Sequence, residues 1–255
     1  MLSRAIRKFY HRNPFLEAVP WLMLASAMRF YAYGAGGLGA LLGMTISNLC
    51  VFLAFLLAAR RLIEWTGGAV QFGQSPLRDQ LRLGQQILNR VLVLLIGMAA
   101  LVALLGFKSL APNFLMGFDG IAFDQFTMPG MVWSAFLAGM VFLMLVDAEA
   151  NGKPSLPRSV HALVQHWRWV LPAILLVALM QIVLSFVQGQ ARYLVWLTWQ
   201  QTGPTPVKNF VYFGFVFGFA TIRLWVTLAI LTFALREAYR RMPGTALAMV
   251  PNSGS

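Results

Sequence analysis

One apolar stretch constrains this chain more than any other feature. Residues 209–235 form an almost unbroken apolar run that contains a single charge, Arg223, and is followed by a basic segment at 236–241. An α-helix rises about 1.5 Å per residue and a bilayer core is about 30 Å thick, so about 20 apolar residues cross it. This run is long enough to span a membrane, and similar runs precede it. The sequence therefore predicts an all-α, polytopic integral membrane protein.

The composition agrees with a membrane protein and excludes several other classes. The chain is 59% hydrophobic and 11% charged, whereas a soluble domain carries about 25% charged residues. A formal net charge of +12 would suggest nucleic acid in a soluble protein, but cytoplasmic loops of membrane proteins collect Lys and Arg. We therefore expect no nucleic-acid partner. Cys50 is the single cysteine, which excludes an internal disulfide and a cysteine-based metal site.

Six runs are long and apolar enough to be predicted as transmembrane helices. They cover about residues 15–33, 38–59, 91–107, 129–146, 170–187 and 209–235. The first run follows a basic segment, as in a cleaved signal peptide, but Glu17 and Pro20 lie within it and no good cleavage site follows. We therefore expect an uncleaved first span. The loops are too short for a soluble catalytic domain, so residues 1–255 are predicted to form one transmembrane domain.

Two further segments read as amphipathic helices that lie at the membrane surface. They cover about residues 77–90 and 158–169, and each leads directly into a span. Their apolar faces are predicted to consist of Leu77, Leu81, Leu88 and Val91 in the first helix, and of Val160, Leu163, Val164 and Trp167 in the second. An apolar face opposite a basic polar face is typical of helices in the headgroup region.

The distribution of basic residues predicts the orientation. With six spans, 15 of the 20 Lys and Arg residues fall on one side, whereas the other side holds only Lys108, Arg192 and Lys208. The positive-inside rule then places both termini in the cytoplasm of a bacterial-type inner (plasma) membrane. A basic cytoplasmic rim also attracts the anionic headgroups of membrane lipids.

Arg223 is the sharpest candidate site, because a charge near mid-membrane costs about 2.5 kcal/mol or more. Asp119 and Asp124 are assigned to the connector 108–128, on the outer side of the membrane. No acid in the chain is therefore expected at the depth of Arg223. A structural interpretation pairs Arg223 with backbone carbonyls, Asn48 or Gln181, or lets it extend outward toward water. The functional interpretation is an anion or lipid-headgroup site, or a pairing with an acid on another subunit.

Two more residues complete the predicted binding set. Thr227 shares a helix face with Arg223, because residues four apart lie on one side of a helix. Arg29 lies near the outer end of the first span. It is expected either to anchor that span at the interface or to join Arg223 around one anionic group.

The connector 108–128 carries two Phe-Asp pairs, Phe118-Asp119 and Phe123-Asp124. Their spacing does not match a calcium-binding loop. We expect a loop that dips partly into the membrane with its carboxylates facing water, and the alternative is an acidic lip that attracts a cation.

Two pairs of glycines have the GxxxG spacing that lets a neighbouring helix approach closely. They are Gly39 with Gly43, and Gly214 with Gly218. We expect both pairs to pack against other helices.

The sequence contains no HExxH, GxSxG or P-loop motif. His161 and His166 lie five apart and do not share a helix face, so we expect no metal and no cofactor. The first functional hypothesis is a non-enzymatic accessory or scaffold subunit that acts through other membrane subunits or a homo-oligomer. The second is a carrier or lipid-handling protein that holds an anionic group at Arg223. No acid and base could be placed at one depth for an intramembrane enzyme, and no catalytic residue is predicted.

Overall fold

The computed structural model describes residues 15–65, 77–124, 127–201 and 205–241. Within these ranges every regular element is a helix, and turns or coil connect the helices. The helices are α2 (Val19–Ala35), α3 (Gly37–Trp65), α4 (Leu77–Leu104), α5 (Ala111–Leu115), the short 3₁₀ helix η2 (Asp119–Ile121), α6 (Met128–Asn151), α7 (Leu156–Gln165), α8 (Trp167–Gln201) and α9 (Thr205–Arg241). The basic N-terminal segment and the C-terminal tail used in the orientation prediction lie outside the described residues.

Five helices, α3, α4, α6, α8 and α9, are long and apolar enough to cross a membrane. The prediction of an all-α chain with several apolar spans is therefore confirmed. The predicted first span, 15–33, corresponds to α2, which has 17 residues and is shorter than the five. Residues 15–18 form a turn, and α2 ends before Gly36, whose φ is 63°, a conformation that L-residues with side chains seldom adopt. The count of six spans is thus not established by helix length.

The first predicted interfacial helix is not a separate element. Residues 77–104 form one continuous helix, α4, because no glycine or proline interrupts residues 85–95. The buried stripe of α4 includes Leu83, Ile87, Val91 and Leu95, which are four residues apart and share one face. Leu81 is 60% exposed. Because the predicted apolar face was expected to lie against lipid and not against the protein, it stays a prediction.

The second predicted interfacial helix is separate but shorter than expected. It is α7, which ends at Gln165, and His166 breaks the helix with φ −107° and ψ 23°. The helix α8 then begins at Trp167 and continues to Gln201, well beyond the predicted end of the span at 187. The predicted connector 189–208 is therefore mostly helix. No proline lies in residues 188–201, and proline is the residue that most strongly ends a helix.

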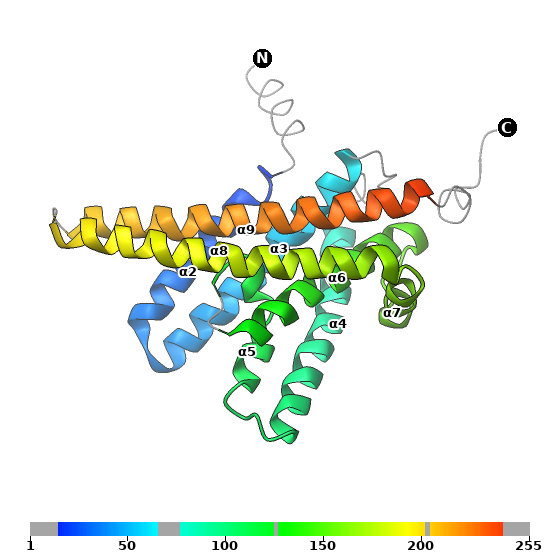
Figure 1. Cartoon of the computed structure of the whole chain (residues 1–255), viewed down its shortest axis with the longest axis horizontal. Helices are drawn as coiled ribbons and strands as arrows, with labels where there is room; N and C mark the ends of the chain where they lie inside the picture. The colour runs from blue at the N-terminus through cyan, green and yellow to red at the C-terminus, as the bar shows by residue number, and fades with distance from the viewer. Residues whose placement is uncertain (1–14, 66–76, 125–126, 202–204, 242–255) are drawn as a thin grey trace, which may run out of the picture.

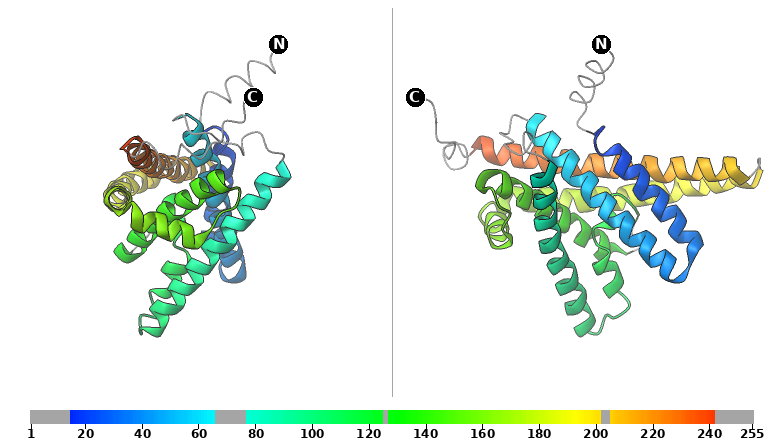
Figure 2. Two further views of the ribbon diagram at one scale, coloured as in Figure 1. Left: turned by 90° about the vertical axis from the view of Figure 1, so that its right-hand side faces the viewer. Right: turned by 180° about the vertical axis from the view of Figure 1, so that it is seen from behind.

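The two longest helices, α8 and α9, lie side by side along the long axis of the molecule (Figure 1). The α2–α3 hairpin and α4 extend away from this pair at other angles (Figures 1 and 2). The helix α6 lies at the centre of the molecule. In its most apolar stretch 78% of the residues are buried, whereas the corresponding share in the other four apolar helices is 22–39%. The outward apolar faces of those four helices are suited to contact with lipid.

Candidate functional site

Arg223 lies on α9, and 1% of the residue is exposed. Its Nε donates to Gln188 Oε1 at 3.1 Å, and its Nη2 donates to Ser185 Oγ at 2.8 Å and to Asp124 Oδ1 at 3.2 Å. Its Nη1 makes no hydrogen bond to the described part of the chain. The expectation that no acid reaches the depth of Arg223 is wrong, because Asp124 forms an ion pair with it.

Arg29 on α2 forms a second buried ion pair, with Asp119. Its Nε donates to the Tyr33 hydroxyl at 3.0 Å, and its guanidinium carbon lies 4.5 Å from the centre of the Phe123 ring. A guanidinium over an aromatic face at this distance is stabilised by a cation–π interaction. Only 5% of Arg29 is exposed, so it does not have the exposed position expected of an interface anchor. It ties the connector to α2.

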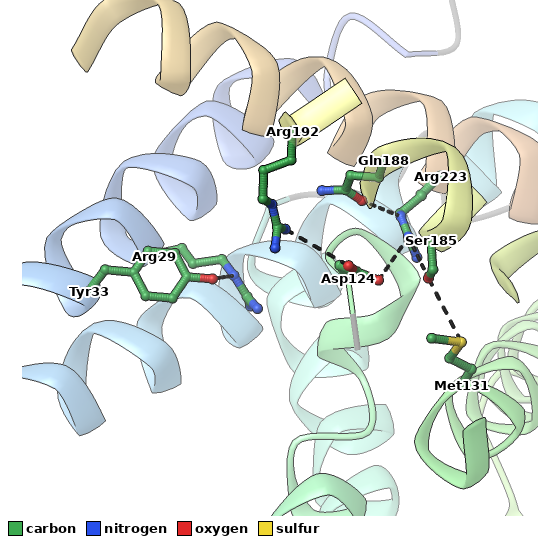
Figure 3. A network of polar contacts seen from close by, with 8 residues as sticks. All are labelled: Arg29, Tyr33, Asp124, Met131, Ser185, Gln188, Arg192 and Arg223. Carbon is green, nitrogen blue, oxygen red and sulfur yellow. Dashed lines mark hydrogen bonds and ion pairs between the residues drawn. The ribbon is translucent and has the colours of Figure 1, made fainter. Parts of the chain in front are cut away.

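Arg192 is the third guanidinium of the cluster and comes from α8. Its Nη2 lies 3.8 Å from Asp124 Oδ2, which is a loose ion pair beyond hydrogen-bonding distance. Figure 3 shows Arg192 and Arg223 on either side of Asp124, with Arg29 and Tyr33 beyond Arg192. Three arginines thus face two carboxylates, Asp119 and Asp124, and the cluster carries a formal charge of +1 (+3 − 2).

The connector is held between the helices by aromatic packing. The Phe118 ring stands edge-on to Phe52 and Phe55 of α3, with centroids 5.4 and 5.7 Å apart. Trp133 of α6 donates its Nε1 hydrogen to the Phe114 carbonyl at 3.0 Å. These contacts fix the part of the connector that directly precedes the two carboxylates.

Asp119 is buried and Asp124 is mostly covered, so the prediction that both carboxylates face water is wrong. The Asp119 and Asp124 side chains are 9% and 15% exposed, and both are engaged by arginines. A cation-binding lip is equally disfavoured, because these guanidiniums already neutralise the carboxylates. The driving force is electrostatic, since a buried arginine is tolerated only when an acid and other acceptors surround it.

The sequence hypothesis found only part of this site. Besides the two acids, it missed Tyr33, Ser185, Gln188 and Arg192. The signal was a polar stripe on α8, since Gln181, Ser185, Gln188 and Arg192 follow one another at steps of four, three and four residues. This spacing places all four on one helix face.

The partners predicted for Arg223 do not reach it. Asn48 donates to the Met44 carbonyl at 3.0 Å and lies 3.5 Å from Met116 Sδ. Gln181 and Thr227 are both 2% exposed, but neither hydrogen-bonds to Arg223 among the described residues. The side-chain amide of Gln181 has no hydrogen-bond partner in that part of the chain. Gln181 lies on α8 one turn before Ser185, at the N-terminal end of the same stripe.

The two glycine pairs differ in what they contact. A Cβ added at Gly43 would lie 2.9 Å from Ala32 Cβ and 3.0 Å from the Met28 carbonyl oxygen, and one at Gly39 would lie 3.1 Å from Ala35 Cβ. These glycines therefore allow α2 and α3 to pack closely. Apart from the backbone of α9 itself and the two chain neighbours, no heavy atom of the described residues lies within 4 Å of a Cβ added at Gly214 or Gly218. The packing predicted for that pair is absent from the described residues, because this face of α9 points away from its neighbours.

An open pocket of about 270 Å³ adjoins the cluster. It is lined by Phe30, Tyr33, Arg192 and Tyr212, which come from α2, α8 and α9. The rings of Phe30 and Tyr212 face each other with centroids 6.1 Å apart. Arg192 belongs to both the pocket and the cluster, so one guanidinium of the cluster is accessible from the pocket.

The site combines unused hydrogen-bond donors with a net positive charge, and both features favour the binding of an anion. The described residues contain no group of three or more His, Cys, Asp or Glu that could hold a metal ion. Comparison with known proteins gives no match to a family model, a curated protein or a solved structure. The function below is therefore inferred from the geometry of the site.

Proposed function

We propose that this chain is a non-enzymatic, multi-pass protein of a bacterial-type inner membrane that binds an anionic group at Arg223, as a lipid-handling protein or carrier. One observation carries the proposal. Three arginines face two carboxylates, and Nη1 of the buried Arg223 has no hydrogen-bond partner among the described residues. The excess charge lies on Arg192, whose side chain is 42% exposed, and an anion bound beside it would neutralise the cluster.

The proposed topology has six spans, with α2 as the additional one. A helix of 17 residues rises about 25 Å, close to the thickness of a bilayer core. The α2 helix packs along α3, which is one of the five apolar helices. A crossing by α2 gives an even number of spans and places both chain ends on the basic, cytoplasmic side.

The arginine variants Arg223→Gln and Arg223→Lys test the proposal. We expect the protein purified from native membranes to retain an anionic lipid or small anion, detected by native mass spectrometry. Arg223→Gln should lose at least about tenfold in occupancy, which corresponds to about 1.4 kcal/mol. Arg223→Lys should retain part of it, because the charge remains while the planar donor fork is lost.

The matched control is Arg168→Gln, which removes an exposed arginine at the other end of α8. This control should leave the bound anion unchanged. Size-exclusion chromatography of each variant reports folding. Equal retention of the anion by wild type and a folded Arg223→Gln protein, or no anion in either, contradicts the proposal.

An accessory or scaffold subunit is the second candidate. The face of α9 around Gly214 and Gly218 is open in the described structure, and GxxxG faces are typical of helix–helix contacts in membranes. Gly218→Ile should then remove a stoichiometric membrane partner, or a second copy of the chain, from the complex purified in mild detergent. Purification of wild type without such a partner contradicts this second function and leaves the anion-binding proposal unaffected.

A further inference from the structure

The pocket beside the cluster is lined by three aromatic side chains and one arginine. Phe30, Tyr33 and Tyr212 supply the rings, and Arg192 supplies the charge. Tyr33 and Arg192 also contact members of the buried cluster. The pocket therefore combines an apolar surface with access to the positive charge.

Tyr33 has a hydrogen to donate into the pocket. Its hydroxyl oxygen accepts a hydrogen bond from Arg29 Nε at 3.0 Å, and Arg29 can only donate. The phenolic hydrogen is therefore directed elsewhere. Because Tyr33 is 54% exposed and lines the pocket, that hydrogen is available to an acceptor placed there.

Arg192 also has donors that its protein partner does not use. The distance of 3.8 Å to Asp124 leaves no direct hydrogen bond, and Nε of Arg192 has no partner among the described residues. Its side chain is 42% exposed. A guanidinium offers a planar fork of donors that matches two oxygens of a phosphate.

The charge of the cluster selects a monoanion. Three guanidiniums and two carboxylates leave +1. A phosphodiester carries a single negative charge, whereas a phosphomonoester carries about 1.5 to 2 near neutral pH. One phosphodiester would therefore neutralise the cluster.

The surroundings of the pocket favour an amphiphile. Tyr31, Tyr193 and Phe210 are 54%, 57% and 76% exposed, and each lies within two residues of a residue that lines the pocket. Tyrosines gather at the level of lipid headgroups in membrane proteins. The rings of Phe30 and Tyr212, which line the pocket, give the glycerol and acyl chains an apolar surface that a free inorganic anion does not need.

We infer that this pocket binds an anionic phosphodiester lipid of the phosphatidylglycerol type. Its phosphate lies between the Arg192 guanidinium and the Tyr33 hydroxyl, and its glycerol backbone lies against Phe30 and Tyr212. This inference rests on the proposed anion-binding function and specifies the ligand and the residues that contact it.

The test uses the full chain in neutral detergent. Binding of phosphatidylglycerol, phosphatidylcholine and soluble glycerol phosphate is measured by native mass spectrometry titration. We expect phosphatidylglycerol to bind at least about tenfold more tightly than either of the others. Arg192→Gln should weaken its binding at least about tenfold, and Tyr33→Phe about three- to tenfold, because one hydrogen bond is lost.

The matched controls are Lys208→Gln, which removes a positive charge near the start of α9, and Tyr193→Phe, which removes a hydroxyl next to Arg192. Neither residue lines the pocket, so both variants should bind the lipid as wild type does. Equal losses in the Arg192 and Lys208 variants overturn the inference, as does equally tight binding of glycerol phosphate. If Arg223→Gln loses the anion while Arg192→Gln retains it, the inference fails and the proposed function stands. If the Arg223→Gln and Arg192→Gln variants both retain the anion, the inference and the proposed function are both overturned.

Discussion

At the scale of single residues, the two connector carboxylates explain how buried arginines are tolerated. Asp119 pairs with Arg29 and Asp124 pairs with Arg223. Each pair also fastens the connector to a different helix, α2 or α9. Such pairs are costly to break one partner at a time, because the remaining charge is left buried without compensation.

A double-mutant cycle measures this effect for Arg29 and Asp119. Arg29→Met and Asp119→Leu should each lower the free energy of unfolding by about 3–5 kcal/mol. The double variant should lower the free energy of unfolding by about 2 kcal/mol less than the sum of the two single effects, since no unpaired charge remains. Reversible unfolding in mixed micelles provides the measurement.

The control cycle uses Arg158 and Asp147, whose ion pair of 3.3 Å involves an arginine that is 49% exposed. Its coupling energy should be below about 1 kcal/mol. Additive effects in the Arg29–Asp119 cycle would show that the buried pair is not coupled and would contradict this account of the connector.

At the scale of elements, small residues decide how closely two helices approach. The helices α2 and α3 meet at Gly43, where the Met28 backbone leaves no room for a side chain. The connector meets α6 at Gly117, where an added Cβ would lie 2.8 Å from Leu137 Cδ1 and would also collide with the Trp133 ring. At Gly214 no such neighbour lies among the described residues.

Alanine substitutions at these glycines should therefore have opposite effects. Gly43→Ala and Gly117→Ala should each destabilise the protein by about 1–3 kcal/mol, because the added methyl forces the backbone or a ring to move. Gly214→Ala should be neutral or stabilising by up to about 1 kcal/mol, since alanine favours helix over glycine. Thermal unfolding of the purified variants distinguishes them, and a Gly43 variant as stable as wild type would contradict the close α2–α3 contact.

At the scale of the whole molecule, the helical hairpins share one buried site. The tip of the α2–α3 hairpin, the adjoining ends of α8 and α9, and the turn after α4 point outward from the bundle in different directions (Figure 1). The connector with α5 and η2 lies between them and contacts α3, α6 and α9. The proposed topology places these three tips on the outer side of the membrane.

Cysteine labelling tests this arrangement in a Cys50→Ala background. Single cysteines at the exposed positions Ala35, Lys108 and Lys153 are treated with a membrane-impermeant maleimide in intact cells. Ala35→Cys and Lys108→Cys should react from outside, whereas Lys153→Cys should react only after permeabilisation. The unaltered protein should remain unlabelled because Cys50 is 4% exposed. Labelling of positions 35 and 108 from opposite sides would contradict the six-span topology.

The sequence alone determined the helical class and the apolar spans, because the transfer free energy of a segment into lipid is a sum over its own residues. It placed α6 within a few residues at its start, where Thr127 caps the helix by accepting from the Gly130 backbone N–H. It also singled out Arg29 and Arg223 as unusual. All of these outcomes depend only on residues that are close together in the chain.

Only the tertiary structure decided the partners of those arginines. Asp119 lies 90 residues from Arg29, and Asp124 lies 99 residues from Arg223. It likewise decided that Gly43 packs closely while Gly214 does not. These outcomes depend on how the helices and the connector lie against one another, and local periodicity carries no information on that. The sequence thus predicts which charges need compensation, and the packing of the connector supplies it.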